Sequence, residues 1–108
     1  MTVWAVSSIT ETPEIVLTSW LIAETDKNER HFVGYNLTAG EGRVSSAIMK
    51  FDHVKKMGIT QSGRVYHLKG NPGQNADAMH TWNTWRAINN VQSWSDVTAQ
   101  ALAEPTNE

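Results

Sequence analysis

Basic side chains in the middle of the sequence are its most distinctive chemical feature. Residues 43–86 carry seven lysines and arginines against two acids (+5), whereas residues 1–42 carry two bases against six acids (−4) and residues 87–108 carry three acids (−3). A surface with this charge pattern attracts anions or nucleic acid. The candidate binding residues are Arg43, Lys50, Lys55, Lys56, Arg64 and Lys69. Domains that depend on phosphate contacts are usually basic overall. Because the formal net charge here is −2, internal charge complementarity is the favoured interpretation.

Catalytic and metal-binding motifs are missing from the sequence. Because the chain has no cysteine, disulfides, thiolate metal sites and cysteine nucleophiles are excluded. The four histidines lack metal-ligand spacing, and no serine lies in a nucleophile motif. We therefore predict no catalytic residue, no metal and no cofactor. A small enzyme is the least favoured class, and it requires a pocket that places His53, His67 or His80 beside a carboxylate.

A glycine-containing loop, Gly70–Gln74, connects the end of a predicted strand to the start of a predicted helix. Loops of this kind form many anion sites, because backbone N–H groups and the helix dipole face the ligand. This loop lacks the Gly-Lys-Ser/Thr ending of a P-loop, and Asp77 competes with an anion for the positive end of the helix. A structural corner is favoured, and the sequence leaves open whether the loop binds an anion.

Strands are predicted over residues 2–69. Apolar and β-branched runs on both sides of Asp26–Glu29 predict a hairpin, and further short runs are separated by turns that contain glycine. Strict alternation along 15–22 places Ile15 and Leu17 on one face, and Trp20 and Ile22 on the other. The segment TVWAVSSI, residues 2–9, is a further candidate strand.

Helical spacing begins after the strands. Apolar residues at three- and four-residue steps predict a helix over residues 75–89, with Asn75 as its N-cap and Asn89–Asn90 as its end. An S-x-x-D capping box predicts a second, short helix over residues 94–103. The predicted fold class is α+β: an antiparallel meander of about four to six strands, covered on one face by the first helix.

Trp82 and Trp85 lie on the apolar side of the predicted helix. Each large aromatic side chain removes on the order of 200 Å² from water, so this pair is interpreted as core. The alternative is a stacking platform for bases or sugars. Such platforms usually stand on an exposed sheet or groove.

The 108 residues predict one domain spanning 1–108. No signal peptide and no membrane-spanning run is present, which predicts a soluble cytoplasmic protein with no membrane association. The expected function is a non-catalytic protein-interaction or accessory module that binds its partner through an exposed strand edge or sheet face. The alternative is nucleic-acid or anion binding, which added salt would weaken steeply. No pattern specifies the partner or the oligomeric state.

Several strings together resemble a group of small bacterial and prophage-associated proteins of unknown function. They are HFVGYN, GEGRVSS, SGRVYHLKGNPG, ADAMHTW and INNVQSWSDVT, and they span residues 31–98. The resemblance implies a small intracellular accessory protein. It brings no activity, cofactor or catalytic residue to this chain.

Overall fold

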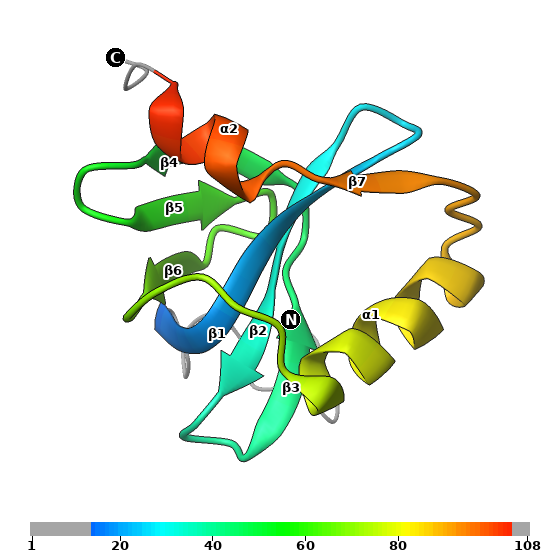
Figure 1. Ribbon diagram of the computed structural model, residues 1–108, viewed down its shortest axis with the longest axis horizontal. Coiled ribbons are helices and arrows are strands. Elements are labelled where there is room, and N and C mark those ends of the chain that lie inside the picture. Colours follow the sequence, from blue (N-terminus) through cyan, green and yellow to red (C-terminus); the bar gives the residue numbers. More distant parts are fainter. Residues whose placement is uncertain (1–13, 105–108) are drawn as a thin grey trace.

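The computed structural model describes residues 14–104, which form an α+β fold with a mixed sheet of seven strands and two helices (Figure 1). The strands are β1 (Glu14–Thr25), β2 (Arg30–Asn36), β3 (Glu41–Val44), β4 (Ile48–Asp52), β5 (Met57–Thr60), β6 (Val65–Leu68) and β7 (Trp94–Asp96). The helices are α1 (Ala76–Ile88) and α2 (Thr98–Ala103). The strand predicted over residues 2–9 lies outside the described residues.

The strand order is β3-β2-β1-β6-β5-β4, and β7 also pairs with β1. Most neighbours are antiparallel, but β1 and β6 are parallel, with Glu14 opposite Val65 and Leu17 opposite Leu68. The predicted antiparallel meander is therefore wrong at this pair, and the predicted strand number is too low. Turn residues reveal only strands that follow one another in the chain, whereas β6 returns to β1 after four intervening strands.

A bend in β1 explains how this strand serves two parts of the sheet. Ser19 has a φ of 46°, and the β1–β2 register shifts between Thr18 and Leu21. The first half of β1 pairs with β6, and the second half pairs with β2 and β7. A bulge of this kind reverses the side-chain alternation beyond it. Leu17 and Trp20 consequently lie in the same buried cluster, and the predicted strict alternation is wrong.

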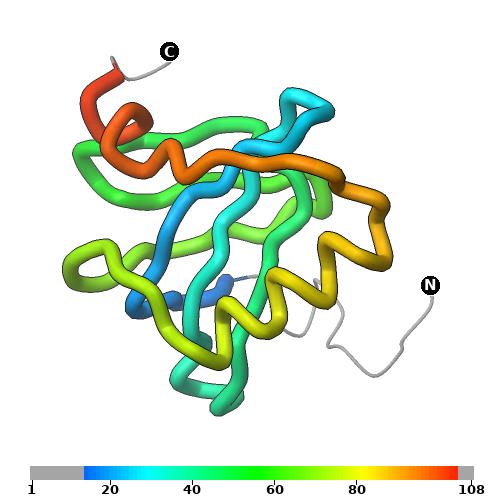
Figure 2. Tube along the Cα trace, turned by 45° about the vertical axis from the view of Figure 1, so that its right-hand side comes forward, coloured from blue at the N-terminus to red at the C-terminus, as the bar shows by residue number. Residues whose placement is uncertain are grey.

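Two hydrophobic clusters lie on opposite faces of β1 and β2. One fills the space between the two halves of the sheet and includes Ile15, Leu17, Trp20, Ile22, Phe32, Tyr66 and Leu68. The other joins β1 and β2 to α1 through Leu21, Ala23, Val33, Ala78 and Trp82. Helix α1 runs beside β3, while α2 lies above β4 in the view of Figure 1, and Figure 2 shows the same separation. Helix α1 thus packs on β3, β2 and part of β1 rather than across the whole sheet.

Helix α1 is capped at both ends by the predicted residues. The Asn75 side chain accepts a hydrogen bond of 3.0 Å from the Ala78 N–H, and Asn90 has a φ of 57° after the last turn. Both predicted caps are confirmed. Trp82 is fully buried, which confirms its interpretation as core. Trp85 is half-buried and stacks on Trp82, with ring centroids 5.4 Å apart.

The helix predicted over residues 94–103 is wrong in its first part. Residues 94–96 form β7 instead, with Trp94 opposite Thr25 of β1. Asp96 then accepts a 3.0 Å hydrogen bond from the Thr98 N–H, and α2 begins only at Thr98. The capping box failed as a predictor because pairing with β1 holds this segment extended. The Thr98 hydroxyl also accepts a hydrogen bond of 2.9 Å from the Ile22 N–H, which fixes α2 to β1.

Candidate functional site

Two of the six predicted binding residues are engaged inside the fold. The Arg43 guanidinium donates a 2.9 Å hydrogen bond from Nε to the Tyr66 hydroxyl and lies 5.9 Å from the centre of that ring. Arg64 is buried, with 9% of its surface exposed. Their positive charges are therefore used in or near the core.

The four lysines lie nearer the surface. Lys50 and Lys55 line one shallow pocket of about 230 Å³ on the β4–β5 side. The Lys56 carbonyl accepts a 2.8 Å hydrogen bond from the Leu68 N–H, which brings the β4–β5 turn close to Lys69. The anion-binding hypothesis stays a prediction, and these lysines are the residues that support it.

The Gly70–Gln74 loop is fixed to Trp20. The Trp20 indole N–H donates a 3.3 Å hydrogen bond to the Gly70 carbonyl, and the Gly73 N–H donates a 2.9 Å bond to the Trp20 carbonyl. The loop therefore acts as a structural corner between β6 and α1.

The three histidines named for the enzyme class occupy different environments. His67 pairs with Glu14 at 2.8 Å, and both side chains are more than a third exposed. His53 lines a cavity beside β4, and His80 lies on the exposed side of α1. Between residues 14 and 104, no group of three or more acidic or histidine side chains is arranged to hold a metal ion.

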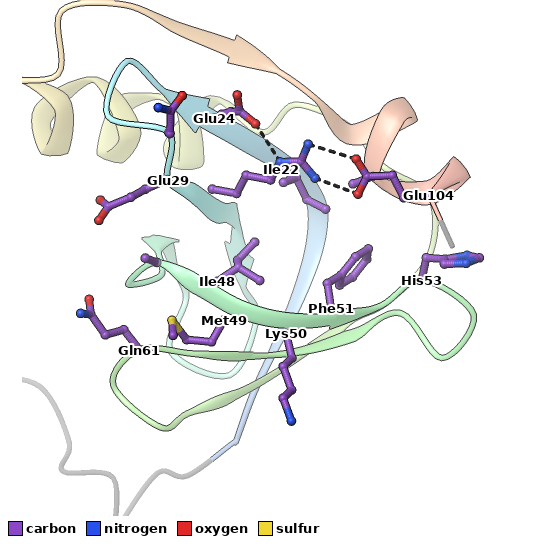
Figure 3. A pocket seen from close by; sticks show the side chains of 14 residues that line it. Ile22, Glu24, Glu29, Ile48, Met49, Lys50, Phe51, His53, Gln61 and Glu104 are labelled. Atoms are coloured by element: carbon purple, nitrogen blue, oxygen red, sulfur yellow. Dashed lines mark hydrogen bonds and ion pairs between the residues drawn. The ribbon is translucent and has the colours of Figure 1, made fainter. Parts of the chain in front are cut away.

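A cavity of about 360 Å³ runs along the outer edge of β4 (Figure 3). Five consecutive residues, Ala47 to Phe51, line it. Side chains of a strand alternate between two faces, so an unbroken run of lining residues indicates a cavity along the strand edge. Ile48 and Phe51 point into the cavity toward Ile22, whereas Lys50 points away. In the described sheet, β4 pairs with β5 alone.

The opposite wall of the cavity is an ion-pair network centred on Arg30. Its guanidinium donates 3.1 and 3.2 Å hydrogen bonds to the two carboxylate oxygens of Glu104, and a 2.9 Å bond to Glu24. The hydrogen bond to Arg30 lowers the pKa of the Glu104 carboxyl, and the same bond raises the pKa of Arg30. Sequence reasoning missed this network because its partners are up to 74 positions apart.

This network makes part of the stability depend on pH. The Glu104 side chain is 43% exposed, so we expect Glu104→Gln to lower the free energy of unfolding by less than about 1 kcal/mol at neutral pH. The pKa of Glu104 is lower in the folded protein, so its contribution is complete above the ordinary pKa of 4.5. This contribution declines as the pH falls below 4.5, and it is lost once the pH falls below the lowered pKa of Glu104 in the folded protein.

Urea denaturation at several pH values measures this effect. The difference in the free energy of unfolding between wild type and Glu104→Gln should disappear in acid. Glu41→Gln, at an exposed position outside the network, is the matched control. Its free energy of unfolding at neutral pH should differ from that of wild type by less than the value for Glu104→Gln does. A difference between wild type and Glu104→Gln that grows as the pH falls would contradict the interpretation.

A second pocket of about 350 Å³ adjoins the β4 cavity. Glu29, Ala47 and Gln61 line both. The second pocket extends toward α1 and is bordered by His31 and Trp85. The two spaces therefore form neighbouring parts of one side of the molecule.

No protein-family model, curated protein or solved structure matches this chain. The resemblance to small prophage-associated proteins accordingly stays a prediction. No helix within residues 14–104 is long and apolar enough to cross a membrane.

Proposed function

We propose that this protein is a non-catalytic interaction module that binds an extended segment of a partner protein along the open edge of β4. The observation that supports this most directly is the cavity that follows Ala47 to Phe51 along that edge. An exposed edge presents unpaired N–H and C=O groups, and peptides bind such edges by adding a strand. Cytoplasmic location and an accessory role belong to the same proposal.

The chemistry of the cavity suggests which peptide it accepts. Its inner surface includes the apolar side chains Ile22, Ile48 and Phe51, which suit an aliphatic or aromatic side chain of the partner. Its rim includes Glu29, whose side chain is 52% exposed. The charge of Arg30 is already balanced by two carboxylates. The proposed ligand is therefore an extended peptide with an apolar residue and a neighbouring basic residue.

A selection of short random peptides against the whole protein tests the proposal. Binding by strand addition requires main-chain hydrogen bonds, so N-methylation of the selected peptide should weaken binding at alternate positions only. Each harmful methyl group should weaken binding by about tenfold, measured by calorimetry. Loss of binding at every position, or at none, would contradict strand addition.

A protein variant provides the complementary test. Met49 is 63% exposed, and the β4–β5 register passes from Ile48 to Lys50 without it. Met49→Pro removes one backbone N–H of β4 at the position that the β4–β5 register skips, between the pairs made by Ile48 and Lys50. We expect it to weaken peptide binding by about tenfold or more. Leu37→Pro, at an exposed turn position away from the cavity, is the matched control and should bind normally.

A further inference from the structure

His31 is a buried histidine held in one orientation. Its side chain is 3% exposed, and Nδ1 lies 2.9 Å from the Ser45 carbonyl oxygen. A carbonyl oxygen only accepts hydrogen bonds, so Nδ1 carries the proton. In the neutral ring, Nε2 is then a hydrogen-bond acceptor with its lone pair directed away from Ser45.

The Nε2 atom of His31 has no hydrogen-bond partner among the described residues. A carboxylate oxygen of Glu29 stands 3.9 Å from it. Two acceptors do not bond each other, but one donor nitrogen placed between them can bond both. A buried acceptor without a partner is unfavourable, so a ligand that supplies this donor binds more tightly.

The surrounding pocket suits a cation on an aliphatic stem. The Trp85 ring centroid lies 4.6 Å from that of His31, and Trp85 lines the pocket. Aromatic faces attract ammonium groups, and the Glu29 carboxylate adds a negative charge. Val44, Ala47 and Val91 supply apolar surface for a hydrocarbon chain.

We propose that this pocket binds a primary alkylammonium group, which a lysine side chain or a free polyamine would supply. This goes beyond strand addition at β4, because it assigns a ligand class to the neighbouring pocket, which shares Glu29 with the β4 cavity. Nε2 is shielded from solvent, so the ammonium enters past the half-exposed Glu29 side chain. Lys27 also borders the pocket, but its ammonium donates a 2.8 Å hydrogen bond to the Asn89 carbonyl at the exposed rim.

The test is an NMR titration of the full protein that follows the imidazole of His31 and the indole N–H of Trp85. The probes are N-acetyl-lysine methylamide and putrescine, and N-acetyl-norleucine methylamide is the uncharged control. Both amines should shift these signals with millimolar or tighter affinity, whereas norleucine amide should bind about fivefold more weakly or not at all. Binding of only one amine would identify the lysine or the polyamine source.

Variants distinguish this site from the β4 edge. Glu29→Gln, at an exposed side chain, should weaken amine binding by about fivefold, and Lys27→Met should strengthen it by removing a neighbouring positive charge. Met49→Pro should leave amine binding unchanged even if it abolishes peptide binding. Equal binding of lysine and norleucine amides, no binding of either amine, or no effect of Glu29→Gln would overturn the proposal.

Discussion

Replacing Trp82 by alanine is expected to lower the free energy of unfolding by about 3–5 kcal/mol, the largest effect among the substitutions considered. Trp82 is fully buried, stacks on Trp85 and meets the edge of Trp94 at a centroid distance of 5.4 Å. Removing it leaves a cavity between α1 and the sheet. Urea denaturation followed by circular dichroism measures the change.

Two further substitutions show whether the effect comes from lost packing. The Trp82 indole N–H has no acceptor among the described residues, so Trp82→Phe removes no hydrogen bond and should destabilise less than alanine. Trp85 is only half-buried, so Trp85→Ala should also destabilise less than Trp82→Ala. If Trp82→Ala changes the stability by less than Trp85→Ala does, the helix packing described above is wrong.

Replacing Gly42 by alanine is expected to destabilise the protein by about 1–3 kcal/mol through overpacking. A Cβ atom at this position would lie 2.5 Å from the Asp77 carbonyl oxygen and 2.7 Å from the Ala78 Cα atom. Both are backbone atoms of α1, which would have to move away from β3. No side-chain rotation relieves this contact.

Gly73→Ala is the matched control for Gly42→Ala. Its added Cβ atom would lie 3.8 Å from the nearest Ser19 atom, which is an ordinary contact distance. Thermal unfolding should therefore give a clearly lower Tm for Gly42→Ala than for Gly73→Ala. Equal stability of the Gly42→Ala and Gly73→Ala proteins would show that α1 does not lie against β3 as the structure has it.

The parts of the fold that sequence reasoning predicted are those determined by local chemistry. Helix α1 follows from its apolar spacing, from Asn75 as an N-cap and from Asn90 as a left-handed end, and all of these are short-range signals. The buried position of Trp82 follows from the same spacing. The α+β class follows from the change in the spacing of apolar residues, from alternation in the strands to three- and four-residue steps in the helix.

The parts that sequence reasoning missed depend on contacts between distant residues. A positive φ at Ser19 has no signal in a run of β-branched and aromatic neighbours, yet it changes which side chains share the core. Residues 94–96 satisfy a capping pattern, but pairing with β1 keeps them extended. Tertiary contacts override local propensity in both places.

The candidate site was even less accessible from sequence. Charge counting identified basic residues but gave no means of telling solvent-exposed lysines from Arg43 and Arg64, which the fold engages. The features that support the proposals are the open edge of β4 and the acceptor of His31. Both arise only when separate segments come together.

The bend at Ser19 has a consequence for how the molecule opens. Because β1 is a member of both halves of the sheet, fraying of one half leaves β1 hydrogen-bonded in the other half. Its central amides should therefore exchange with solvent only when the entire structure is lost. Strand β4, by contrast, lies at an end of the strand order of the described sheet and pairs with one neighbour, β5. We therefore expect local opening of the sheet, and contact with another chain, to begin at β4.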